Sequence, residues 1–397
     1  MILRRTLSSA LVCVTLLSLA IRCEGGEKSP SLVPPEMVEQ GWLALFNGQD
    51  LAGWEVLGTT AEWRVQDGTL TNVGTGLGWL ATVSSWGDFD LLVEWKLSKG
   101  GNSSVYFRAG TAGVTWQNGY DVQLDQDDEE NPTGSIFGRI KATKVPVPDE
   151  EWHTTEIHTE GSRIVVKIDG QEVLSGEDST FAHGRIGLQM HDDKTTVQFR
   201  KVWVRPLGLK PLFNGKDFTG WRVRKNDRPD HPQPDVRIEE SAIRIQGGPG
   251  YVESASEHAD FHARFKIETL PRGDNSSNSG VFVRGPRVPG DNFTIWPEGL
   301  EVQVFNELND FTTGGFYSHV AARALYAQND EWFWMDVNAV ENRYVAWVNG
   351  MPAAAWVDPG NRFVKGILAL QAHDPKSVIY YGAVELAELA PHVDLKE

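Results

Sequence analysis

Side chains that can transfer protons or form hydrogen bonds with a ligand recur at every second position of one short stretch. Residues 120–125 read YDVQLD, so Asp121, Gln123 and Asp125 alternate with other residue types. Such alternation is typical of a β-strand, in which successive side chains point to opposite faces. We therefore expect two carboxylates and one amide to share a face of a sheet.

A second stretch supplies a matching set of polar groups. In residues 104–108, SVYFR, the side chains of Ser104, Tyr106 and Arg108 fall on one face of a predicted strand. If the two strands are neighbours, that face suits a small polyhydroxylated ligand. The alternative is that the face is only the solvated side of an antiparallel sheet.

Both stretches occur twice in the chain, which favours a functional interpretation of the polar face. Four of the blocks that recur in one order are LFNGQDLAGW (45–54) with LFNGKDFTGW (212–221), NSSVYFR (102–108) with NSGVFVR (278–284), GYDVQL (119–124) with GLEVQV (299–304), and GRIGLQMHDD (184–193) with GILALQAHDP (366–375). A repeat of this length is a whole domain rather than a solenoid unit, so the sequence indicates a tandem duplication.

Each copy has the pattern of short strands joined by tight turns. Runs rich in Val, Ile, Phe, Trp and Thr are separated by pairs such as Asp169-Gly170, which mark hairpins because glycine accepts the positive φ of these turns. Many short strands predict an all-β fold, and the length of each copy favours a two-sheet jelly-roll β-sandwich. We expect such domains at residues 40–207 and 208–397.

The N-terminus has the features of a secretory signal. Two arginines precede an apolar run that is too short to span a bilayer comfortably, so residues 1–23 are predicted to be a signal peptide and residues 24–39 a linker. The protein is then exported, to the periplasm or the cell exterior. A lipid anchor on Cys23 is the less favoured alternative, because Arg22 stands where a small residue is needed.

The cysteine content, the net charge and the apolar runs of the chain limit the kinds of molecule that it can bind. Both cysteines lie in or beside the predicted signal, so disulfides do not stabilise the domains. The formal net charge of −17 disfavours nucleic acid, because an acidic protein repels a phosphate backbone. No other apolar run approaches the length of a membrane span. The polar face described above suits a small polyhydroxylated partner, such as a carbohydrate.

These blocks resemble a bacterial family known as the 3-keto-disaccharide hydrolase domain. The first copy carries nearly all of the family's motifs, among them FNGQDLAGW, WRVQDGTL, NSSVYFR, GYDVQLD, TGSIFG and GRIGLQMH. The resemblance implies a concanavalin A-like jelly-roll fold in both copies. Asp121 departs from the family, which has Glu there; Glu301 restores the Glu in the second copy, but Phe305 replaces Asp125. The second copy is the more diverged one.

The resemblance implies a substrate in which C3 of a hexose has been oxidised to a ketone. The ketone acidifies the C2 proton, so a base can remove it, the C1 oxygen can leave, and water can add back. The enolate oxygen needs a donor or a cation, and a divalent metal is possible. The catalytic candidates are Asp121, Arg108, Asp125, His191 and Glu94 in the first copy and Glu301, Arg284 and His373 in the second. The substrate-binding candidates are Tyr106, Gln123, Gln189 and Gln303.

The sequence leaves two functions open. In the first, at least the first copy is an enzyme for 3-keto glycosides, which requires Arg108, Asp121 and His191 to share one pocket. In the second, the protein is a non-catalytic, lectin-like carbohydrate-binding protein. Asp121 mildly favours the second, because its shorter side chain displaces a catalytic carboxylate by about 1 Å. Arg108 also has a structural interpretation, as an ion pair with Asp121 or Glu94.

Overall fold

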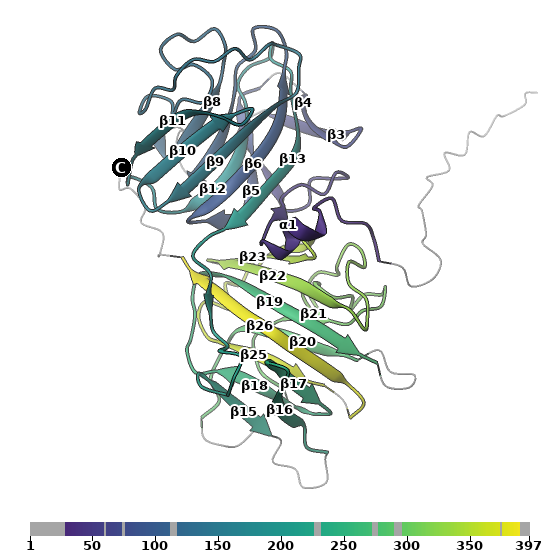
Figure 1. Cartoon of the computed structure of the whole chain (residues 1–397). Coiled ribbons are helices and arrows are strands. Elements are labelled where there is room, and N and C mark those ends of the chain that lie inside the picture. The colour runs from purple at the N-terminus through teal and green to yellow at the C-terminus, as the bar shows by residue number, and fades with distance from the viewer. Residues whose placement is uncertain are drawn as a thin grey trace, which may run out of the picture.

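The chain folds almost entirely into β-strands, as the sequence predicts. The computed structural model describes residues 28–389 except 59–60, 74–75, 112–116, 226–231, 272–276, 290–295 and 374. The predicted signal peptide and both cysteines lie outside these described residues. Within them, the single helix is α1 (Pro35–Glu39), and no helix is long and apolar enough to cross a membrane. The predicted pair of tandem jelly-roll β-sandwiches is confirmed (Figure 1).

The first sandwich consists of two antiparallel sheets built from β1 to β13. Its eight-stranded sheet is ordered β11 (Gln171–Glu177), β10 (Arg163–Ile168), β9 (His153–Glu160), β6 (Phe89–Leu97), β13 (Val197–Pro206), β4 (Thr69–Val73) and β3 (Glu62–Gln66), with β1 (Leu43–Ala44) paired to β13. Its five-stranded sheet is ordered β2 (Trp54–Gly58), β5 (Gly78–Trp86), β12 (Gly184–Met190), β7 (Ser103–Ala109) and β8 (Tyr120–Leu124).

The second sandwich repeats this order strand for strand with β14 to β26. In the corresponding direction, its eight-stranded sheet is ordered β24 (Met351–Val357), β23 (Arg343–Val348), β22 (Trp332–Val340), β19 (Phe261–Leu270), β26 (Val378–Glu388), β17 (Ala242–Gln246) and β16 (Asp235–Glu239), with β14 (Lys210–Pro211) paired to β26. Its five-stranded sheet is ordered β15 (Trp221–Lys225), β18 (Gly250–Ser254), β25 (Ile367–Ala372), β20 (Ser279–Gly285) and β21 (Leu300–Val304). The boundary predicted between residues 207 and 208 falls between β13 and β14.

Alternating side chains build the core between the two sheets of each sandwich. Every second residue of β6, from Phe89 to Leu97, is buried, and Val105 and Val122 point inward from the facing sheet. Burying one such apolar side chain stabilises the fold by about 1.5–3 kcal/mol. Because the side chains alternate, the polar residues between them on β7 and β8 point to the outer face of the five-stranded sheet.

Part of the segment predicted to be a linker belongs to the fold, so that expectation was wrong. Val38 in α1 is buried in the core of the second sandwich, and the guanidinium of Arg264 donates a hydrogen bond to its carbonyl. The next element, β1, pairs with the first sandwich, while the indole of Trp347 from the second donates a hydrogen bond of 2.8 Å to the carbonyl of Ala44. The segment from α1 to β1 therefore bridges the two sandwiches (Figure 1).

Candidate functional site

The predicted polar face forms on the outer side of the five-stranded sheet of the first sandwich. β7 and β8 are antiparallel neighbours, with Tyr106 opposite Asp121 and Ser104 opposite Gln123. The Ser104 hydroxyl donates a hydrogen bond of 3.3 Å to the Gln123 side chain. The structure thus confirms that these four side chains share one face.

In the first sandwich this face is closed. Asp121 is only 4% exposed. Tyr106 packs edge-on against Trp79, with ring centroids 5.6 Å apart, and the Gln189 amide donates a hydrogen bond of 2.5 Å to the Tyr106 hydroxyl. Burial raises the pKa of Asp121 to about 7, and a hydrogen bond from Ser104 opposes that rise. A carboxyl group enclosed in this way has little access to a sugar.

Arg108 does not point toward Asp121, contrary to the prediction from alternation. Its φ of 47° lies in the left-handed region, and β7 has an irregular register against β12 between Tyr106 and Ala109. Such a bulge breaks the alternation and redirects the side chain. The guanidinium is buried and donates hydrogen bonds to the Asp88 carboxylate and to the carbonyls of Gly87, Gly161 and Phe181. It holds loops together, so both its catalytic role and its pairing with Asp121 or Glu94 are contradicted.

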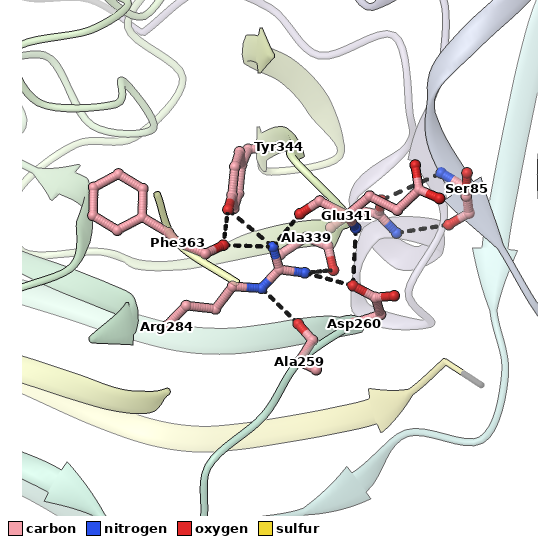
Figure 2. A network of polar contacts seen from close by, with 9 residues as sticks. Ser85, Ala259, Asp260, Arg284, Ala339, Glu341, Tyr344 and Phe363 are labelled. Carbon is pink, nitrogen blue, oxygen red and sulfur yellow. Dashed lines mark hydrogen bonds and ion pairs between the residues drawn. The ribbon is translucent and has the colours of Figure 1, made fainter. Parts of the chain in front are cut away.

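Arg284 repeats this arrangement in the second sandwich, as Figure 2 shows. Its φ is 54°, and its guanidinium donates hydrogen bonds of 2.8 Å to the Asp260 carboxylate and of 2.9 Å to the Tyr344 hydroxyl. Its other acceptors are the carbonyls of Ala259, Glu341, Phe363 and Ala339. With all of these donors engaged in holding the chain, Arg284 is a structural residue and the prediction of a catalytic role is contradicted.

Glu94 and Asp125 are also engaged in structural contacts. Glu94 is on β6 in the eight-stranded sheet, where Arg200 and Lys201 neutralise it. These neighbours outweigh burial and lower its pKa. Asp125 accepts hydrogen bonds of 2.8 and 3.1 Å from the backbone amides of residues 127 and 128, so it caps a loop.

His191 pairs with its neighbour Asp192, with Nδ1 and Oδ2 3.2 Å apart. Arg108 and His191 thus have partners other than Asp121, and the structure does not bring the three side chains into contact.

The corresponding face of the second sandwich is open. A cavity of about 610 Å³ is lined by Glu301, Gln303, Gln371 and His373, together with aromatic side chains. The Gln303 amide donates a hydrogen bond of 2.7 Å to Asn278, whose own amide nitrogen lies 3.3 Å from Nε2 of His373. The structure thus brings together three residues predicted for the second copy and adds Gln371 and Asn278.

Glu301 is the titratable carboxyl group of this cavity. It lies on β21, opposite Phe282 of β20, and it is half-buried. Burial raises its pKa to about 8. A carboxyl group that titrates near neutral pH and faces a cavity has the properties of a general acid or base.

A glycine that the sequence analysis did not single out makes room for Glu301. A Cβ atom at Gly280 would lie 2.2 Å from Oε1 of Glu301, far inside van der Waals contact. In the first copy the corresponding pair is Ser104 and Asp121, a larger residue beside a shorter acid. The smaller residue at position 280 thus compensates for the longer acid at position 301. A comparison of the NSSV and NSGV blocks, together with Asp121 and Glu301, could have revealed this pair of changes from the sequence.

No residue cluster identifies a metal in the described part of the chain. A group of three or more His, Cys, Asp or Glu side chains placed to hold an ion is not found among the residues that the structure describes.

Comparison with known proteins places these features in a family. The sequence model of a family described as the 3-keto-alpha-glucoside-1,2-lyase-like domain matches residues 41–205 and again 208–386. A curated 3-keto-disaccharide hydrolase from Bacteroides thetaiotaomicron is 30% identical over 167 residues, which are 34% of this chain and 58% of that protein. The match therefore spans little more than half of that relative's length.

Solved structures with similar folds include carbohydrate-binding proteins. A carbohydrate-binding module from Bacillus subtilis has 21% identity and a TM-score of 0.32, covering 39% of this chain and 96% of the module. A protein with a galectin-like fold from the same organism has 14% identity and a TM-score of 0.35, covering 47% of this chain and 97% of that one.

Proposed function

This chain belongs to the 3-keto-alpha-glucoside-1,2-lyase-like domain family, and from that premise we propose that its second sandwich cleaves 3-keto glycosides with Glu301 as the base. The observation that carries the proposal is that Glu301 lines a cavity of about 610 Å³ with its pKa raised to about 8. A base is most effective when its pKa lies near the working pH, because it is then both partly ionised and basic enough.

The reaction follows from the chemistry of the ketone. The Glu301 carboxylate takes the C2 proton, and the electron pair of the C2–H bond forms an enolate with its charge on O3. Gln371 and His373 lie on the same cavity wall and supply groups that can donate hydrogen bonds to that oxygen. The ketone re-forms as the C1–O bond breaks, and the leaving oxygen takes the proton held by Glu301. Water then adds across the C1–C2 double bond, which completes a net hydrolysis.

The first sandwich is better suited to a non-catalytic role. Its carboxyl group, Asp121, is 4% exposed, and Asp125 is engaged in capping a loop. This observation keeps the second candidate function, carbohydrate binding without catalysis, open for the first sandwich. The prediction that the first copy at least is active is thus replaced by a proposal for the second.

The test is turnover of a 3-keto α-glucoside that carries a chromogenic leaving group, with and without added divalent metal. We expect Glu301→Gln to lower turnover by about 10²- to 10⁴-fold, the usual size of a general-base contribution. Asp121→Asn is the matched control and should keep most of the activity. Loss of turnover in Asp121→Asn but not in Glu301→Gln would place the active site in the first sandwich. No turnover by the unmodified protein, with sugar binding intact, would favour a binding protein.

A further inference from the structure

Exposed aromatic side chains gather around the cavity of Glu301. In the described part of the chain, four Trp, Tyr or Phe residues are more than a third exposed, and three of them, Trp296, Phe311 and Tyr317, line this cavity. Exposing a large aromatic side chain to water is unfavourable unless a ligand or partner covers it. The concentration of three such residues at one carboxyl group therefore indicates a surface that a substrate covers.

The aromatic residues divide between two sides of Glu301. Trp296 stacks on His373, with ring centroids 5.1 Å apart and planes at 23°, and His373 directly follows β25, an inner strand of the sheet. Phe311 and Tyr317 pack together with centroids 5.3 Å apart. They follow the edge strand β21, where the backbone amide of Tyr317 donates a hydrogen bond of 3.0 Å to the carbonyl of Glu301. The Gln371 amide and the His373 imidazole thus lie toward the sheet interior, and Phe311 and Tyr317 form an aromatic wall beside the edge strand.

The first sandwich supplies an internal comparison for this wall. The Thr313 hydroxyl accepts a hydrogen bond from the backbone amide of Phe305, eight residues earlier. In the first copy the Thr133 hydroxyl accepts one from the amide of Asp125, also eight residues earlier. The two loops therefore correspond residue for residue. In that register Phe305 and Phe311 occupy the positions of Asp125 and Asn131.

The replaced residues are polar and engaged in their own loop. Asp125 accepts a hydrogen bond of 2.8 Å from the amide of Asp127, and Asn131 accepts one of 3.1 Å from the amide of Gly138. The second copy has exchanged both polar side chains for phenylalanine at the border of its cavity. This exchange removes hydrogen-bonding groups and adds apolar surface in one place.

The geometry points to an aromatic or similarly apolar alcohol as the leaving group of the substrate, held against Phe305, Phe311 and Tyr317. The inference rests on the proposed function of Glu301. A second sugar in this position would turn hydroxyl groups toward two phenylalanine rings, and hydroxyls that lose water without gaining a partner are costly. An aromatic ring loses little by leaving water and gains contact with the rings. The polar side with Gln371 and His373 then suits the keto sugar.

Benzyl and methyl 3-keto α-glucosides test this inference. Their leaving alcohols have similar acidity, so a difference in kcat/KM reports contact with the alcohol rather than ease of departure. We expect the benzyl compound to exceed the methyl compound by about tenfold or more, as burial of a ring predicts. The double variant Phe305→Asp with Phe311→Asn, which restores the residues of the first copy, should bring this ratio close to one. Asn131→Ala is the control and should leave the ratio unchanged.

The outcomes separate the inference from the function on which it rests. Turnover of both compounds at equal kcat/KM in the unmodified protein would overturn the aromatic leaving group and leave the role of Glu301 standing. Turnover of neither would overturn the proposed function. In that case calorimetry with the unoxidised benzyl and methyl α-glucosides tests whether the aromatic wall binds an aromatic group. Tighter binding of the benzyl compound that is lost in the double variant would support this role of the wall. Equal binding of the two compounds would refute it.

Discussion

Gly280 and Glu301 lie so close that the backbone of one defines the space available to the other. A side chain at Gly280 would begin 2.2 Å from Oε1 and 2.8 Å from Cγ of Glu301. The first copy has Ser104 and the shorter Asp121 at these two positions, and its carboxyl group is buried. The two copies thus combine a different small residue with a different acid at this contact, and only the longer acid faces a cavity.

Gly280→Ala should lower turnover by about 10²-fold, because the added Cβ displaces the carboxyl group and a shift of about 1 Å has that cost for a catalytic group. The backbone of Gly280 has no positive φ, so alanine is compatible with the strand and the effect should come from the collision. Steady-state kinetics with a 3-keto glucoside measures it. Ser104→Gly in the first sandwich is the matched control, and equal effects of the two changes would argue against an active second sandwich.

The pH dependence of turnover should follow the ionisation of Glu301. Burial raises its pKa to about 8, and the base must be ionised to accept a proton. We therefore expect kcat/KM to rise about tenfold per pH unit below pH 8 and to level off above it. A profile from pH 5 to 10 checks this. A rate that falls as pH rises through 8 would instead assign Glu301 the role of an acid.

Asp121 should make the fold less stable as pH rises. Burial raises its pKa in the folded state to about 7 from an ordinary 3.8. Between about pH 4 and pH 7 the unfolded chain releases this proton while the folded chain keeps it, so the free energy of unfolding falls as pH rises. The Asp121→Asn variant has no carboxyl group at this position, so its free energy of unfolding does not fall with pH for this reason. The difference in unfolding free energy between Asp121→Asn and the unmodified protein, from denaturant titrations, should grow in favour of the variant over that interval. A difference that stays constant with pH would contradict the buried acid.

Replacing the buried arginines should affect stability more than chemistry. Arg284→Met removes a buried cation and leaves a half-buried Asp260 and several carbonyls without their donor, and breaking a buried ion pair costs about 3–5 kcal/mol. Arg237→Met is the control, because Arg237 is half exposed and pairs at the surface, where ion pairs contribute at most about 1 kcal/mol. Calorimetric unfolding compares the two. Arg108→Met, assayed well below its melting temperature, should keep its activity per folded molecule, and a selective loss of kcat would restore a catalytic role.

Much of the fold was predictable because it follows from local alternation and repetition. Alternating residues of β7 and β8 identified the face shared by Tyr106 and Asp121, and the repeated blocks identified two sandwiches of one type. Alternation failed at Arg108, where a positive φ and a bulge turn the side chain away. A bulge inserts one residue into an otherwise regular pattern, and the FR and VR sequences contain no signal for it.

The sequence by itself determined the residue types and the duplication, and its resemblance to a family implied the chemistry that a carboxylate could perform on a 3-keto sugar. Only the tertiary structure decided which of the two carboxyl groups faces a cavity, because access depends on contacts between strands that lie far apart along the chain. Gln189 and Tyr106 close the face over Asp121, whereas Gly280 leaves room for Glu301 beside a cavity. Burial then sets the pKa of each acid, and burial is a property of the assembled fold rather than of any one stretch of sequence.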